Sequence, residues 1–219
     1  KNFFKDCEIR FACFILIFFI LSASIMCMYE FDYASSSINE PIDYLTSLRY
    51  SGFQIISCLT TTGFGNVPNI AYLGPGAIYL SILAMIIGGG VGSTAGAIKQ
   101  YRVVIILKEL KWSIKYKLTP RRQLYPHNVT RAGKTVEVTP EVFRDASLYA
   151  SLYIVVLFVL SLALVFLPNI SITVSIYEVS SALSGTGNSI LDFLAYKANN
   201  TLYCYNILLI IFIYTIVIQ

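Results

Sequence analysis

The sequence predicts an all-α membrane protein made of two copies of one unit. Each unit would consist of a membrane helix, a short helix, a Thr/Gly segment and a second membrane helix. The composition fits a membrane protein, because 56% of the 219 residues are hydrophobic and only 13% are charged. The repeat is directly visible, since Ser-Cys-Leu-Thr-Thr-Thr-Gly at 57–63 is matched without a gap by Ser-Ala-Leu-Ser-Gly-Thr-Gly at 181–187.

The first unit covers residues 1–108. Its expected parts are a membrane helix at 11–28, a short helix at 44–60, a Thr/Gly segment at 61–65 and a second membrane helix at 72–108. The first helix is free of charge and of spanning length. The short helix can be capped by Asp43. Because it contains Arg49 and Gln54, it is too polar to cross the bilayer, and we expect it to enter from one side and end inside.

The helix at 72–108 is too long to cross a bilayer without a break. At 1.5 Å per residue it would measure about 54 Å, against a hydrocarbon core of about 30 Å. The glycine-rich segment at 88–96 is the expected break. Its spacing also allows a close-packing helix face, since Gly88, Gly92 and Gly96 recur every four residues, and spacing alone favours that face.

The second unit follows a basic connection at 109–143 and covers residues 144–219. Its expected parts are a membrane helix at 146–167, a short helix at 172–183, a Thr/Gly segment at 185–189 and a last membrane helix at 201–219. The chain ends inside this last apolar run, which suggests a piece of a longer protein.

Charge distribution predicts the orientation. Ten of the 16 Lys and Arg residues lie between Lys99 and Lys134, whereas residues 30–43 carry only acids. The positive-inside rule therefore places the N-terminus and the connection at 109–143 in the cytoplasm, and the Thr/Gly segments toward the outside. Such a basic stretch can also mark a nucleic-acid patch, but beside membrane spans it is better explained by topology and by contact with lipid headgroups. We expect a multi-pass protein of the plasma membrane and no nucleic-acid partner.

The two Thr/Gly segments carry residues suited to binding a dehydrated monovalent cation. Backbone carbonyls can replace the water around such an ion, and glycine lets successive carbonyls turn the same way. We call 61–65 the first filter segment and 185–189 the second. The candidate ion-binding residues are Thr61, Thr62, Gly63, Phe64, Gly65, Gly185, Thr186, Gly187 and Asn188. Taken alone, either segment could equally be a capped helix end with a glycine turn.

These motifs resemble the Trk/Ktr/HKT superfamily of potassium transporters, and in particular the second half of a TrkH- or KtrB-like subunit. The resemblance rests on Phe-Gln-Ile-Ile-Ser at 53–57, on Thr-Thr-Thr-Gly-Phe at 60–64 and on the glycine-rich segment with the Ala-Ile-Lys that follows it. It covers nearly the whole chain and implies half of a pseudo-fourfold, potassium-channel-like pore. It also implies that the glycine-rich segment is a gate below the filter. The gate residues would be Gly88, Gly89, Gly90, Gly92, Ser93, Thr94 and Gly96.

The resemblance also implies partners and a substrate. A family pore needs four filter segments, so an N-terminal half or a second copy would supply the other two, and the full subunit would form a homodimer. A cytosolic nucleotide-binding ring of the TrkA or KtrA type would contact Lys99, Arg102 and Lys108. Potassium would be the substrate, with no cofactor and no transition-metal site. Gly63 and Gly187 favour potassium, because a serine at such a position admits sodium in some plant relatives.

Other functions remain open from the residues alone. The chain could be a non-conducting assembly half, or a sodium-permeable relative. An intramembrane enzyme is disfavoured, because the spans hold almost no ionisable groups. Phe64 could brace the first filter segment or simply anchor it in apolar surroundings. Glu178 and Asp192 could attract cations at the outer mouth, although an exposed or capping role is favoured for both.

Overall fold

The computed structural model describes residues 6–30, 43–67, 69–118, 128–131, 134–166 and 170–191. In chain order the elements are α1 (Cys7–Glu30), α2 (Tyr44–Leu59), the 3₁₀ helix η2 (Ile70–Leu73), α3 (Pro75–Ile87), α4 (Gln100–Leu118), β1 (Asn128–Arg131), β2 (Lys134–Glu137), α5 (Pro140–Val165) and α6 (Ile172–Ser184). The expected last helix at 201–219 and Asp192 lie outside the described residues.

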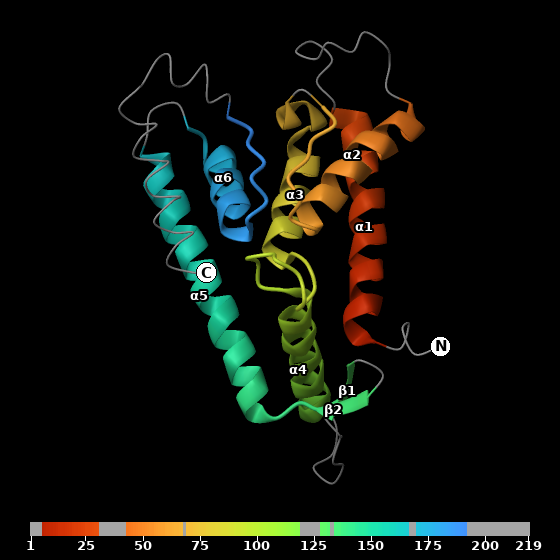
Figure 1. Cartoon of the computed structure of the whole chain (residues 1–219), viewed down its shortest axis with the longest axis vertical. Helices are drawn as coiled ribbons and strands as arrows, with labels where there is room; N and C mark the ends of the chain where they lie inside the picture. Colours follow the sequence, from red (N-terminus) through yellow and green to blue (C-terminus); the bar gives the residue numbers. More distant parts are fainter. Residues whose placement is uncertain are drawn as a thin grey trace.

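Two long helices border the molecule in Figure 1, and both are apolar enough to cross a membrane. They are α1, with 24 residues, and α5, with 26. At 1.5 Å per residue each is about 36–39 Å long, which exceeds the hydrocarbon core of about 30 Å. Their outer faces carry exposed aromatic rings such as Phe14, Phe18 and Phe158. Apolar side chains on these faces fit contact with lipid.

Two shorter helices, α3 and α6, lie between the two long ones in Figure 1, and α2 crosses α1 obliquely. Helix α2 packs closely on α1 because small residues face each other. Ser24 and Ser47 are fully buried there, and the Ser47 hydroxyl donates to the Ser24 carbonyl at 2.6 Å. The second unit repeats the contact, since the Ser175 hydroxyl of α6 donates to the Ser161 carbonyl of α5. Each short helix is therefore held to the long helix of its own unit by a serine.

The expected membrane helix at 72–108 is divided into α3 and α4, and the glycine-rich segment between them is not helical. The packing-face interpretation of its spacing is therefore wrong. Gly88 has a positive φ of 66°, outside the helical range, and ends α3. The chain then folds back, because the amides of Ile98 and Lys99 donate to the carbonyls of Ile86 and Ile87, both at 3.1 Å. Figure 1 shows the resulting yellow-green loop between α3 and α4.

Several element boundaries differ from the sequence-based expectations. Helix α4 continues to Leu118, ten residues beyond the expected end at 108. The connection also contains a hairpin, β1 paired antiparallel with β2, which the sequence did not predict. Helix α5 begins at Pro140, as a proline followed by Glu141 predicts for the first turn of a helix, and it therefore includes six residues before the membrane-spanning part expected at 146–167. Asp43 precedes α2 but makes no side-chain cap.

Candidate functional site

The two filter segments leave their short helices through the same hydrogen bonds. The amide of Thr62 donates to the Ser57 carbonyl at 2.9 Å, and the amide of Thr186 donates to the Ser181 carbonyl at 3.0 Å. A hydroxyl pair follows in both, at 2.7 Å between Thr60 and Thr62 and at 2.6 Å between Ser184 and Thr186. The sequence repeat is therefore also a repeat of backbone geometry.

The backbone of both segments alternates in handedness. Positive φ angles occur at Thr61 (54°) and Gly63 (81°) in the first segment, and at Gly185 (76°) and Gly187 (79°) in the second. In an extended chain, successive carbonyls point to opposite sides. A residue with positive φ between residues with negative φ turns its carbonyl to the same side as its neighbours' carbonyls, which is the arrangement that an ion-coordinating filter requires. Thr61 adopts this conformation without being glycine, which costs about 1–2 kcal/mol. Strain of this kind persists where the surrounding structure imposes it.

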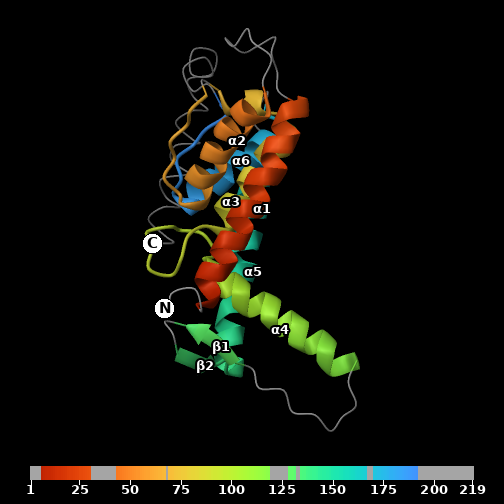
Figure 2. The same ribbon diagram turned by 90° about the vertical axis from the view of Figure 1, so that its right-hand side faces the viewer.

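The two segments touch each other at Gly63. A Cβ atom added to Gly63 would overlap the carbonyl oxygen of Thr186, whereas one added to Gly187 would meet nothing within 4 Å. Figure 2 shows both returning segments, orange after α2 and blue after α6, on the same side of the helix layer. The ion-binding candidates of the two units are thus brought together at one place.

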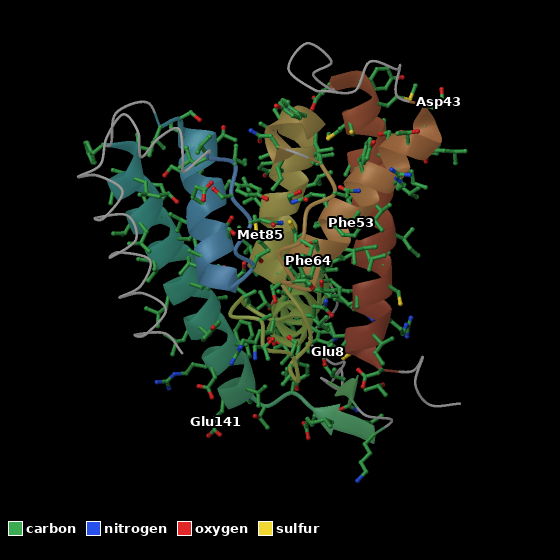
Figure 3. All side chains as sticks on the ribbon, turned by 45° about the horizontal axis from the view of Figure 1, so that its top comes forward. Glu8, Asp43, Phe53, Phe64, Met85 and Glu141 are labelled. Carbon is green, nitrogen blue, oxygen red and sulfur yellow. The ribbon has the colours of Figure 1, made fainter. Side chains whose placement is uncertain are left out.

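The fourth position of each segment differs in exposure. Phe64 is 69% exposed, whereas Asn188 is only 6% exposed. Figure 3 shows Phe64 on the ribbon beside the lower end of α2. The ring therefore does not pack into the core of this chain, and neither role expected for it is visible among the described residues.

Glu178 has a position that the sequence-based interpretation missed. Its side chain is only 6% exposed, and one carboxylate oxygen accepts from the Ser189 hydroxyl at 2.8 Å and from the amides of Ile190 and Leu191 at 2.8 and 3.2 Å. The expectation of a solvent-exposed acid is wrong for this residue, whereas its bonds to backbone amides are of the capping kind that was the other favoured role. Its place in the repeat could have revealed it, because Glu178 aligns with Gln54 of the first unit.

Gln54 joins the two short helices instead of bracing its own filter segment. Its amide nitrogen donates to the Tyr177 hydroxyl at 3.2 Å and contacts the Cys58 sulfur at 3.3 Å. All three side chains are buried. Polar contacts in such an enclosed place are strong, so they fix α2 against α6.

The glycine-rich segment is attached to three other elements. The Gly96 amide donates to the Ser184 carbonyl at the end of α6 at 2.9 Å, and the Tyr149 hydroxyl of α5 donates to the Gly96 carbonyl at 3.3 Å. The Val91 amide donates to the Glu8 carboxylate of α1 at 2.6 Å. Figure 3 shows Glu8 at the lower end of α1, next to the segment. The candidate gate thus lies directly against the second filter segment's helix.

Two of the three expected partner-contact residues are engaged within the chain. The Lys99 ammonium lies 3.4 Å from the Ser93 carbonyl, and Arg102 stacks on the Tyr149 ring at 4.1 Å while it donates to the Ile98 carbonyl. Lys108 lines a pocket between α1 and α4. Lys99 and Arg102 therefore support the glycine-rich segment.

Comparison with known proteins gives consistent matches. The family profile described as TrkH, cation transport protein, matches residues 2–214. An uncharacterized cation transporter of Methanocaldococcus jannaschii is 31% identical over 113 residues, which is 52% of this chain and 23% of that protein. The Trk system potassium uptake protein TrkH of Halomonas elongata is 32% identical over 109 residues, which is 49% of this chain and 20% of that protein.

A solved structure shares the fold. The crystal structure of the potassium transporter TrkH from Vibrio parahaemolyticus matches with a TM-score of 0.67 at 21% identity, over 87% of this chain and 37% of that one. The matched regions are thus about a fifth to a quarter of the length of the two curated relatives. Because the family profile spans nearly every residue, this chain belongs to the TrkH family of cation transport proteins.

Proposed function

We propose that this chain forms half of a potassium-selective pore, with residues 61–65 and 185–189 as two of its four filter segments. One observation carries the proposal: both segments leave a short helix through the same hydrogen bonds and have positive φ at the same two positions. A capped helix end explains one such segment. It does not explain two that meet in space.

In this proposal the ion loses its water at the two filter segments. Carbonyl oxygens take the place of the hydration shell without adding a fixed charge, so that the ion can leave again. Helices α2 and α6 direct their C-terminal ends toward the segments, and the partial negative charge there favours a cation. The chain contributes no covalent chemistry and no cofactor.

The glycine-rich segment would control passage below the filter. It is irregular backbone that directly follows the apolar helix α3, and a membrane tolerates such backbone only against protein or a watery cavity. The N-terminus of α1 and the basic connection would face the cytoplasm of a multi-pass plasma-membrane protein. The remaining two filter segments would come from an N-terminal half or a second copy. A homodimer of the full subunit and a cytosolic nucleotide-binding ring complete the proposal.

Ion flux tests the proposal directly. The complete transporter would be reconstituted in vesicles, and rubidium or potassium uptake would be measured for wild type, Gly63→Ser and Gly187→Ser. We expect saturable potassium uptake by wild type and a lower potassium-to-sodium ratio in both variants. Uptake of sodium and potassium at equal rates by wild type would favour a sodium-permeable relative. No flux from a folded wild type would favour the non-conducting assembly half.

A further inference from the structure

A pocket of about 460 Å³ lies between the first turns of α1 and the middle of α4. Its lining divides into two kinds of side chain. Arg10, Lys108 and Lys111 supply three cationic groups, and Phe11, Phe14 and Leu107 supply apolar surface. Neither the filter segments nor the glycine-rich segment contributes to it.

The surroundings of the pocket carry more positive than negative charge. Within the described ranges, none of its three basic side chains has a hydrogen bond or an ion pair. Two acids, Asp6 and Glu8, lie near enough to act on Cys7 of the lining, and Glu8 also accepts from the Val91 amide. Three cations against two nearby acids leave a net positive charge.

The apolar part of the pocket continues along an uncovered helix. Leu107, Leu110 and Ile114 of α4 are 48%, 57% and 52% exposed. Figure 2 shows that α4 leaves the helix layer on the side opposite to the returning filter segments. The helix that carries these exposed side chains therefore extends away from the proposed pore axis.

We propose that this pocket binds one anionic phospholipid. The phosphate lies among Arg10, Lys108 and Lys111, and an acyl chain lies along Phe14 and Leu107. Basic pockets between membrane helices at the cytoplasmic side are suited to such headgroups. The proposal rests on the proposed function for one point, the cytoplasmic position of the start of α1.

A lipid fits this pocket better than a soluble anion or a protein does. Inorganic phosphate would use the cations and leave the aromatic rings in water. A soluble acidic partner would have to reach the Phe14 ring, which lies about one turn beyond Arg10 along a helix apolar enough to cross a membrane. A phospholipid satisfies both halves of the pocket at once.

Native mass spectrometry of the complete transporter tests the proposal. The protein would be purified in detergent and mixed with equal amounts of phosphatidylglycerol and phosphatidylcholine. We expect wild type to retain phosphatidylglycerol preferentially. The triple variant Arg10→Gln, Lys108→Gln, Lys111→Gln should lose the preference, by about fivefold for each residue and roughly 100-fold in all.

A matched triple variant controls for charge alone. Lys117→Gln, Lys134→Gln and Arg144→Gln remove the same number of exposed cations outside the pocket and should leave the preference unchanged. The proposal would be overturned if wild type retained both lipids equally. It would also be overturned if both triple variants lost the preference for phosphatidylglycerol to the same extent. Displacement of the lipid by inorganic phosphate would overturn it in favour of a free anion site. If the pocket triple variant lost a bound protein partner or a second copy but still retained phosphatidylglycerol, the proposal would be overturned in favour of a protein contact.

Lipid retention is measured without ion flux. A transporter that conducts nothing but retains phosphatidylglycerol selectively would contradict the proposed function and leave the lipid site standing. A transporter that conducts potassium but shows no preference for phosphatidylglycerol would contradict the lipid site and leave the proposed function standing.

Discussion

The two filter segments share a backbone but differ in what holds them. The second is supported from behind by its own helix: Ser181 donates to the Asn188 carbonyl at 2.6 Å, and Glu178 accepts from residues 189–191. In the first, the equivalent Ser57 hydroxyl and the side-chain oxygen of Gln54 are buried without a hydrogen-bond partner among the described residues. Gln54, which occupies the position of Glu178 in the repeat, bonds to Tyr177 of α6 and does not brace its own segment.

The difference shows that one repeat can keep its geometry by two routes. The second segment is fixed by polar contacts within its own unit. The first is fixed by its neighbour, through the contact of Gly63 with the Thr186 carbonyl and through the bond from Gln54 to α6. Buried polar groups without partners are costly, so the first segment has less support of its own. The first segment should therefore respond to changes in the second more than the second responds to changes in the first.

The largest expected effect comes from Gly63→Ala compared with Gly187→Ala. Both changes impose left-handed strain of about 1–2 kcal/mol, but only the first also drives a methyl group into the Thr186 carbonyl. We expect rubidium uptake to fall at least about tenfold further in Gly63→Ala than in Gly187→Ala, since each 1.4 kcal/mol corresponds to a factor of ten. Equal losses would mean that the two segments do not touch in the working pore.

The next effect concerns Glu178. Glu178→Ala removes the acceptor that three donors of residues 189–191 share. The Ser189 hydroxyl and the Leu191 amide keep a bond to each other's residue, whereas the Ile190 amide has no other acceptor among the described residues. An unsatisfied buried donor costs about 1–3 kcal/mol. We expect a drop of about tenfold in the potassium-to-sodium permeability ratio, measured from reversal potentials. Glu178→Gln keeps one acceptor oxygen and should keep most of the selectivity.

Gln54→Ala provides the contrast, because the Gln54 amide nitrogen bonds to Tyr177 and so joins α2 to α6, with no bond to residues of its own filter segment among those described. It should lower thermal stability more than it changes selectivity. If Gln54→Ala and Glu178→Ala change selectivity equally, the proposed asymmetry between the units is wrong.

A smaller effect is expected from Gly96→Ala. An added Cβ would lie 2.6 Å from the Leu183 carbonyl oxygen and would strain the hydrogen bond from the Gly96 amide to Ser184. Gly92→Ala is a matched control, since a Cβ there meets nothing within 4 Å. We expect a several-fold change in flux for Gly96→Ala alone, with cysteine accessibility near the segment as a second measurement. The same change in both variants would remove the link between the glycine-rich segment and α6.

The smallest effect separates Ser181→Ala from Ser57→Ala. Removing the Ser181 hydroxyl breaks a bond to Asn188 and should destabilise the protein by about 1 kcal/mol. Removing the Ser57 hydroxyl deletes a group without a partner among the described residues and should be neutral or slightly stabilising. Thermal unfolding in detergent would compare the stability of the two variants. A larger loss of stability in Ser57→Ala than in Ser181→Ala would contradict the proposed difference between the two segments.

The sequence predicted the helical membrane fold, because apolar run length and charge asymmetry are properties of single segments. The copies at 57–63 and 181–187 also lie at equivalent ends of α2 and α6, with the same hydrogen bonds, and the role of these segments as an ion filter stays a prediction. What it did not predict depends on contacts between distant segments. The residues next to Glu178 in sequence do not show that its carboxylate binds residues 189–191. The residues next to Lys99 and Arg102 likewise do not show that Lys99 contacts the Ser93 carbonyl or that Arg102 stacks on Tyr149. The hairpin at 128–137 was missed because its strands are short and mostly exposed.

The hydrogen bond between the Gly96 amide and the Ser184 carbonyl has a thermodynamic consequence. It joins the segment proposed to open the pore with the helix end that leads into the second filter segment. Any effector that displaces the segment at the cytoplasmic side would therefore also change the affinity of the filter for its ion. Linkage makes this effect reciprocal, so ion occupancy would shift the opening equilibrium by the same factor. Potassium would then act as an allosteric ligand of its own pathway, and the opening of such a pore would depend on the concentration of the ion that it carries.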